Sequence, residues 1–86
     1  MALYAMTLLV TGSPEEVEPV ASDYREQLRA LKGSGRLRAA GEFTAGDGFL
    51  VILDVADRME AEQIARSNPL AEQGLATWML REWQEI

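Results

Sequence analysis

The chain of 86 residues contains no cysteine and no histidine. Without cysteine it can form no disulfide, thiolate nucleophile or zinc knuckle, which is compatible with a reducing cytoplasm. Without histidine it lacks the commonest general base, the usual transition-metal ligand and the only side chain that normally titrates near neutral pH. We therefore expect a cytoplasmic protein without a bound metal or other cofactor.

Basic residues are also scarce, since eight Lys and Arg stand against 14 Asp and Glu, which gives a net charge of −6. A surface of this charge repels nucleic acid phosphates and anionic lipid headgroups. The apolar residues 1–10 lack a basic flank and are too short to cross a bilayer, so they indicate a buried first strand. We expect neither a nucleic acid nor a membrane partner.

The length fits one domain over residues 1–86, and 48% hydrophobic residues are typical of a globular core. Leu3–Val10 is almost continuously apolar and predicts a strand. Ser13 and Glu16 then have the spacing of a capping box, and Pro14 suits a first helical position. The apolar stripe of the helix comprises Val17, Val20, Ala21, Tyr24, Leu28 and Leu31.

Pro19 falls inside this helical pattern, so we expect a kink or a separate first turn there, and Gly33-Ser34-Gly35 should end the helix. Leu37–Thr44 and Phe49–Val55 read as strands joined by a glycine-rich hairpin over residues 45–48. A connection this short makes the two strands antiparallel neighbours.

A second helix should begin at Asp57, because Glu60 completes another capping box, and it should end before Asn68-Pro69. A helical turn over residues 70–73 follows. Leu75–Trp83 predicts the last strand, with the tail fraying into water. The order is β-α-β-β-α-β, an α+β ferredoxin-like arrangement with a four-stranded antiparallel sheet.

The strands Leu3–Val10 and Phe49–Val55 are apolar at both odd and even positions, so both of their faces need burial, although two helices can cover only one face of the sheet. We therefore predict that the uncovered face pairs with a second copy in a homodimer, which could assemble further. The alternative is a loop or the C-terminal tail folding over that face, for which each segment looks too short. Trp78 and Trp83 should point to opposite faces.

Few residues suggest chemistry. Asp54, Asp57, Glu60 and Glu62 crowd together, but their spacing matches no calcium loop and two of them already form the predicted cap. Tyr24 lies on the apolar stripe and needs a hydrogen-bond partner if its hydroxyl is buried, so it could line a pocket. Core packing is the commoner role for such a tyrosine.

The segments YREQLRALKGSGRLRAAG from Tyr24, GFLVILDV and SNPLAEQGLATWMLREW resemble the YciI-like, or YCII-related, family. The most specific parts are "GRLxxAG" at Gly35 and "NPLxxxG" at Asn68. The resemblance implies a dimeric α+β barrel. It also implies an active site that pairs a histidine on the first helix with an aspartate before the proline, at the positions of Tyr24 and Asn68.

Both of the family's catalytic types are thus replaced. An asparagine cannot act as a base, and tyrosine, whose ordinary pKa is about 10, seldom does so at neutral pH. The family's cleft could remain, with Tyr24 and Asn68 as hydrogen-bonding groups and Glu42 and Arg81 as charged neighbours.

Three functions stay open on the sequence. The first is the binding of a small apolar or aromatic metabolite in a cleft between sheet and helices, without the family's proton transfer. The second is an enzyme resembling lyases, dehydrochlorinases or isomerases that uses Tyr24 or Glu42 and would have a raised carboxyl pKa. The third is a non-catalytic assembly or partner-binding module.

Overall fold

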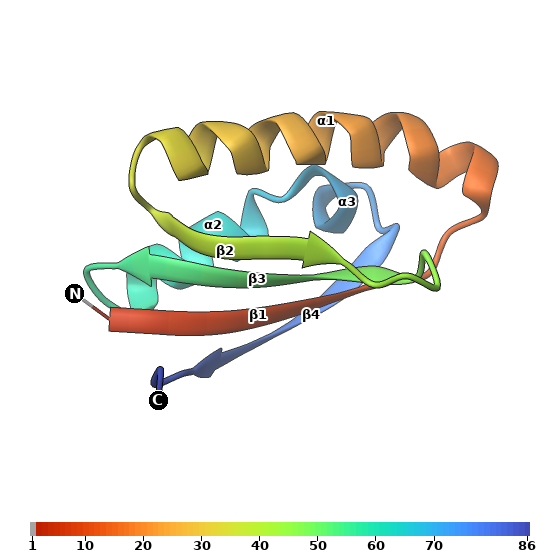
Figure 1. The fold of residues 1–86 in the computed structure, drawn as a ribbon. Coiled ribbons are helices and arrows are strands. Elements are labelled where there is room, and N and C mark those ends of the chain that lie inside the picture. Colours follow the sequence, from red (N-terminus) through yellow and green to blue (C-terminus); the bar gives the residue numbers. More distant parts are fainter. Residues whose placement is uncertain (1) are drawn as a thin grey trace.

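A computed structural model describes residues 2–86 (Figure 1). It confirms the β-α-β-β-α-β order and the predicted short helical turn before the last strand. The elements are β1 (Ala2–Val10), α1 (Pro14–Gly33), β2 (Leu37–Glu42), β3 (Gly48–Val55), α2 (Arg58–Arg66), α3 (Pro69–Glu72) and β4 (Ala76–Glu82). The fold is α+β and ferredoxin-like, as predicted.

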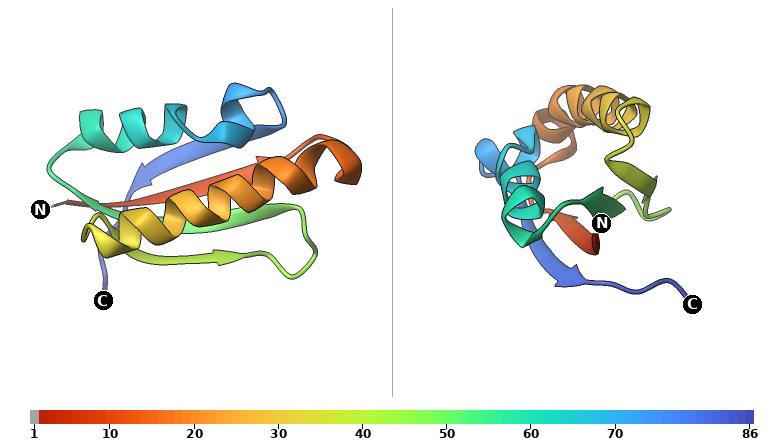
Figure 2. Two further views of the ribbon diagram at one scale, coloured as in Figure 1. Left: turned by 90° about the horizontal axis from the view of Figure 1, so that it is seen from above. Right: turned by 90° about the vertical axis from the view of Figure 1, so that its left-hand side faces the viewer.

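The four strands form one antiparallel sheet in the order β2-β3-β1-β4. The long apolar strands β1 and β3 are therefore central, and the shorter β2 and β4 form the edges. Both views in Figure 2 place the helices on the same side of this sheet. We call that side the covered face and the other side the open face.

Helix α1 differs from its prediction at two positions. Of the two alternatives expected for Pro19, the separate first turn is wrong, because α1 is one continuous helix over 20 residues. The proline lies near the helix start, where its missing N–H removes a single intrahelical bond to the carbonyl of Glu15. Ser13 makes no side-chain cap, since its hydroxyl donates to the Glu16 carboxylate at 2.9 Å.

Helix α2 has the predicted pair of capping residues, with Glu60 reaching the amide just before the N-cap rather than that of the N-cap itself. The Asp57 carboxylate accepts a hydrogen bond from the Glu60 amide, and the Glu60 carboxylate accepts one from the Ala56 amide, each at 2.9 Å. These contacts give hydrogen-bond partners to two backbone amides at the start of α2. They also account for the two acidic residues without a metal.

The first strand of the β2–β3 hairpin is shorter than predicted, because β2 ends at Glu42 rather than at Thr44. The Phe43 amide still donates to the Gly48 carbonyl at 2.9 Å, which closes the turn. Gly48 is required for close packing, since a Cβ there would lie 2.0 Å from the Leu8 carbonyl oxygen of the neighbouring strand.

The core lies between the covered face and the helices. Alternate residues of the central strands fill it, and each of Met6, Leu8, Val51, Leu53 and Val55 is at most 1% exposed. The α1 stripe packs on them through Val20, Ala21, Tyr24 and Leu28. Trp78 points to this side and packs against the core.

The open face carries the other residues of the same strands. Leu9, Leu50 and Met79 are 50%, 42% and 61% exposed, respectively. The tail beyond β4 does not simply fray into water, because Glu85 forms an ion pair with Arg38 of β2. Figure 2 shows the tail passing beneath the sheet on this side, where Ile52 is buried, whereas Leu9, Leu50 and Met79 remain exposed.

A candidate ligand-binding cleft

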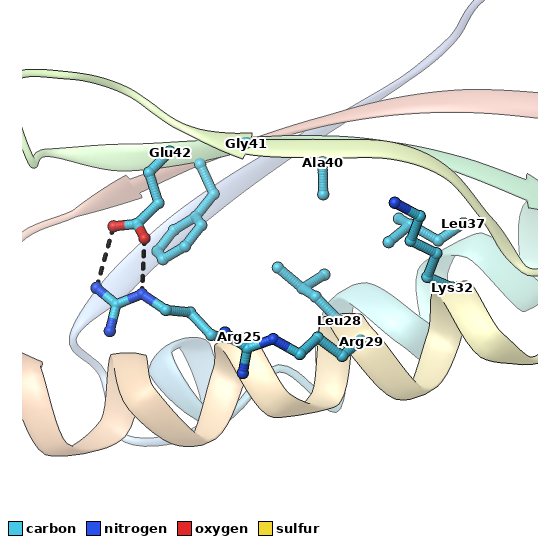
Figure 3. Close-up of a pocket in the computed structure, with 9 residues that line it drawn as sticks. Arg25, Leu28, Arg29, Lys32, Leu37, Ala40, Gly41 and Glu42 are labelled. Atoms are coloured by element: carbon cyan, nitrogen blue, oxygen red, sulfur yellow. Dashed lines mark hydrogen bonds and ion pairs between the residues drawn. The ribbon is translucent and has the colours of Figure 1, made fainter.

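A cleft of about 280 Å³ lies between helix α1 and edge strand β2 (Figure 3). Its apolar lining comes from both elements and from the neighbouring strand β3. The lining residues are Arg25, Leu28, Arg29, Lys32, Leu37, Ala40, Gly41, Glu42 and Phe49. Among residues 2–86, no three Cys, His, Asp or Glu side chains are grouped as a metal site would require.

Small residues in β2 leave this space open. Ala40 pairs with Val51 in the sheet register, so its side chain shares the covered face with that core residue. Figure 3 shows Ala40 and Leu28 facing one another across the gap between strand and helix. A larger residue at position 40 would fill the middle of the cleft.

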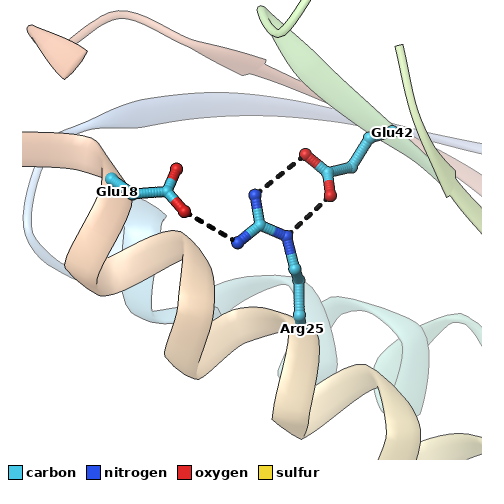
Figure 4. Close-up of polar contacts among 3 residues, drawn as sticks. All are labelled: Glu18, Arg25 and Glu42. Atoms are coloured by element: carbon cyan, nitrogen blue, oxygen red, sulfur yellow. Dashed lines mark hydrogen bonds and ion pairs between the residues drawn. The ribbon is translucent and has the colours of Figure 1, made fainter. Parts of the chain in front are cut away.

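Arg25 and Glu42 join the helix to the strand at one end of the cleft. The Arg25 guanidinium donates to both Glu42 carboxylate oxygens, at 2.6 and 3.1 Å, and to Glu18 at 3.1 Å (Figure 4). The hydrogen bonds from Arg25 lower the pKa of the Glu42 carboxyl below its ordinary value. At neutral pH the Glu42 carboxylate is therefore ionised, and both of its oxygens are already hydrogen-bonded to Arg25.

Arg29 and Lys32 lie further along the same side of α1. Neither forms an ion pair within 4.0 Å with any residue of the described part of the chain, whereas Arg25 has two carboxylate partners. The two cations therefore remain available at the rim of the cleft.

Tyr24 lies behind the cleft wall rather than in it. The side chain is 2% exposed, and its ring meets Phe49 edge to face with centroids 4.9 Å apart. No residue among 2–86 hydrogen-bonds its buried hydroxyl. Burial raises the pKa of this phenol above its ordinary value, so the hydroxyl stays protonated at neutral pH.

Asn68 is 1% exposed and caps helix α3. Its side-chain oxygen accepts a hydrogen bond from the Leu70 amide at 2.9 Å, while its buried amide nitrogen has no hydrogen-bond partner within residues 2–86. Asn68 does not line the α1–β2 cleft. The cap is the turn role that asparagine commonly takes before a short helix.

Arg81 lies on strand β4 opposite Ala5, and its side chain is on the open face. Of the four residues predicted for the site, Glu42 lines the cleft and Tyr24 touches its wall through Phe49. Asn68 and Arg81 lie elsewhere, so the structure does not bring the four together.

Three basic residues of the cleft were not predicted from the sequence. Arg25, Arg29 and Lys32 recur at spacings of four and three, immediately beside the apolar stripe. That spacing places them along one side of a helix and was a usable signal. The sequence could not indicate that β2 would leave room opposite them.

Comparison with known proteins supports the assignment of the fold. The chain is similar to 5-chloro-2-hydroxyhydroquinone dehydrochlorinase from Burkholderia phenoliruptrix, solved in complex with 2,5-dihydroxybenzoquinone. The TM-score is 0.68 and the identity 13%, over 95% of each chain. At this identity the likeness shows a shared fold.

No curated protein sequence matches the chain. No helix of residues 2–86 is both long enough and apolar enough to cross a membrane. The family model of the YCII-related domain, in contrast, matches residues 3–84. Because this match spans nearly the whole chain, the protein belongs to the YCII-related domain family.

Proposed function

We propose that this protein is a cytoplasmic homodimer that binds a small apolar or aromatic molecule in the α1–β2 cleft, without the proton-transfer chemistry of its family. The observation that carries the proposal is the cleft itself, with its apolar wall and convergent charged groups. Ligand sites commonly combine these two features.

The cleft suits a ligand at the small end of the usual range. Its volume of about 280 Å³ lies just below that of sites for drug-sized molecules, which are roughly 300 to 1,000 Å³. Leu28, Leu37 and Phe49 offer an apolar surface on which a single or fused ring could lie. The structural relative with a bound benzoquinone makes a ring compound a reasonable first candidate.

Proton transfer has less support than binding. The raised pKa of Tyr24 disfavours the phenolate that a base would need. The lowered pKa of Glu42 is opposite to the raised value that a carboxyl acid poised near neutrality requires, and Arg25 already occupies both carboxylate oxygens. Tyr24 can support the cleft wall through Phe49, and the Arg25–Glu42 pair can orient a ligand through its charges.

The open face supports the dimer. Leu9, Leu50 and Met79 form an exposed apolar surface in the protomer. A hollow of about 250 Å³ beside them includes Ala39 and Ile52 in its lining. A flexible methionine from a second copy could occupy such a hollow, and stacking the two open faces would remove the apolar surface from water.

The binding proposal can be tested by titrating ¹⁵N-labelled protein with 1-naphthoate and with 1-naphthamide. We expect at least one probe to shift the amide signals of Leu28, Leu37 and Phe49 in a saturable manner. Ala40→Trp should abolish these shifts by filling the cleft. Ala30→Trp, on the exposed side of the same helix, is the matched control and should retain them.

Failure of both probes to shift the cleft signals would contradict the proposed function. Equal binding by Ala40→Trp and the unmodified protein would do the same, because the ligand would then lie elsewhere. An assembly module without a ligand site predicts these negative results together with an intact dimer.

A further inference from the structure

Positive charge is concentrated at the α1–β2 cleft. Three of the eight basic residues of the chain line it, namely Arg25, Arg29 and Lys32, against two carboxylates, those of Glu42 in the lining and of Glu18, which also binds Arg25. The whole chain carries a net charge of −6. The local charge is therefore opposite in sign to that of the protein, which favours an anion at this place.

The three cations are not equivalent. Arg25 is neutralised by its bonds to Glu42 and Glu18. Arg29 and Lys32 have no carboxylate within 4.0 Å among residues 2–86, and Arg81, the remaining basic residue without such a partner, lies on the open face. Two of the three unpaired cations thus border one hollow.

Arg29 and Lys32 are three positions apart on α1, so their backbones are neighbours on the helix surface, although Figure 3 shows the Arg29 guanidinium directed toward Arg25 and the Lys32 ammonium toward Leu37. Both side chains are long and unpaired, so an anion between them could draw the two charged ends together and accept charge-assisted hydrogen bonds from both. Glu42 stands at the other end of the cleft and would repel a second negative charge. The site is therefore suited to a single anionic group.

We infer that the ligand is a small aromatic carboxylate, with its carboxylate between Arg29 and Lys32 and its ring against Leu28, Leu37 and Phe49. This inference rests on the proposed function, because it names the chemical class that the same cleft prefers. The apolar wall supplies burial for the ring, and the two free cations distinguish an acid from its neutral amide.

The two naphthalene probes differ mainly in charge and are nearly equal in shape. We expect 1-naphthoate to bind at least about tenfold more tightly than 1-naphthamide, and this preference should shrink as salt is added. In the double variant Arg29→Gln/Lys32→Gln the two affinities should become similar. Both substitutions are at exposed positions, so the fold should persist.

The matched control is Arg58→Gln/Arg66→Gln, which removes the same charge from α2. It should keep the preference for 1-naphthoate. Equal affinity of the two probes for the unmodified protein would overturn the inference while leaving the proposed function intact. A preference that survives in the Arg29/Lys32 variant, or is lost equally in the control, would also overturn it, whereas no binding of either probe would overturn both.

Discussion

The two faces of the sheet are built from the same strands but have different surroundings. On β3, Leu53 is fully buried under the helices, whereas Leu50, on the opposite face, is 42% exposed. On β1, Leu8 and Leu9 differ in the same way. The apolar pattern of a strand therefore indicates only that both of its faces need to be buried. The order of the elements along the chain decides which face the protein's own helices cover.

The covered face is incomplete in one place, where edge strand β2 and helix α1 stand apart and leave the cleft. The tail reaches across part of the open face to Arg38, and Leu9, Leu50 and Met79 remain exposed on this face. Each face thus offers one free surface, a hollow with charge on the covered side and an apolar area on the open side. We assign the first to a small ligand and the second to another copy of the chain.

The contrast between faces is tested most strongly by trimming one leucine on each. Leu53→Ala should lower the free energy of unfolding by about 2 to 5 kcal/mol, because it leaves a cavity in a packed core. Leu50→Ala should lower that of the protomer by less than about 1 kcal/mol. Urea unfolding followed by circular dichroism, at the lowest practical protein concentration, measures both, and equal losses would remove the distinction between the faces.

A charge on the open face should affect association more than folding. Met79→Lys is expected to weaken the dimer by about a hundredfold, roughly 3 kcal/mol, since the ammonium group would be buried in an apolar interface. Sedimentation velocity over a range of concentrations measures this. Met59→Lys, at an exposed methionine of α2, is the control and should leave the dimer unchanged. A dimer that tolerates Met79→Lys would show that the open face is not the interface.

On the covered face, the hydroxyl of Tyr24 should cost stability rather than add it. Tyr24→Phe removes a buried polar group that has no described partner, and we expect a gain of about 1 kcal/mol in thermal or urea unfolding of the ligand-free protein. Tyr4→Phe, at a second core tyrosine, should have little effect. A loss on Tyr24→Phe larger than that on Tyr4→Phe would mean that the hydroxyl has a stabilising partner.

The smallest expected effect concerns the Arg25–Glu42 ion pair at one end of the cleft. Because the pKa of Glu42 is lowered in the folded protein, its stabilising contribution is fully present above its unfolded pKa and is lost as pH falls through the folded pKa. The pair is exposed, so solvent screening limits Glu42→Gln to a loss of about 0.5 kcal/mol. Urea unfolding should show this difference at about pH 7 and not at about pH 3. A difference that grows with acidity would contradict it.

Most of the fold could be predicted from the sequence because local signals agreed with one another. Capping residues at Asp57 and Glu60, glycines after α1 and at the hairpin, and two long apolar strands all pointed to the same order of elements. The errors arose where a local rule had little effect in context. Pro19 lies near enough to the start of α1 that the first turn stays joined to the helix, and Ser13 bonds a side chain instead of the backbone.

The candidate site was harder to predict because a cleft depends on the spacing between elements. The sequence indicated Glu42 and the stripe that contains Tyr24, but Asn68 and Arg81 lie on other parts of the fold. Arg29 and Lys32 look like ordinary solvent-facing helix residues until Ala40 and Gly41 are seen opposite them. Small residues on an edge strand create space only once a helix stands over them.

The most direct test of the whole account is native mass spectrometry of the protein in the presence of 1-naphthoate. We predict a dimer that carries two ligand molecules, one for each α1–β2 cleft, and a dimer without ligand for Ala40→Trp. A monomer would contradict the role assigned to the open face. A single ligand per dimer would place binding at the interface between the two copies and contradict the role assigned to the cleft.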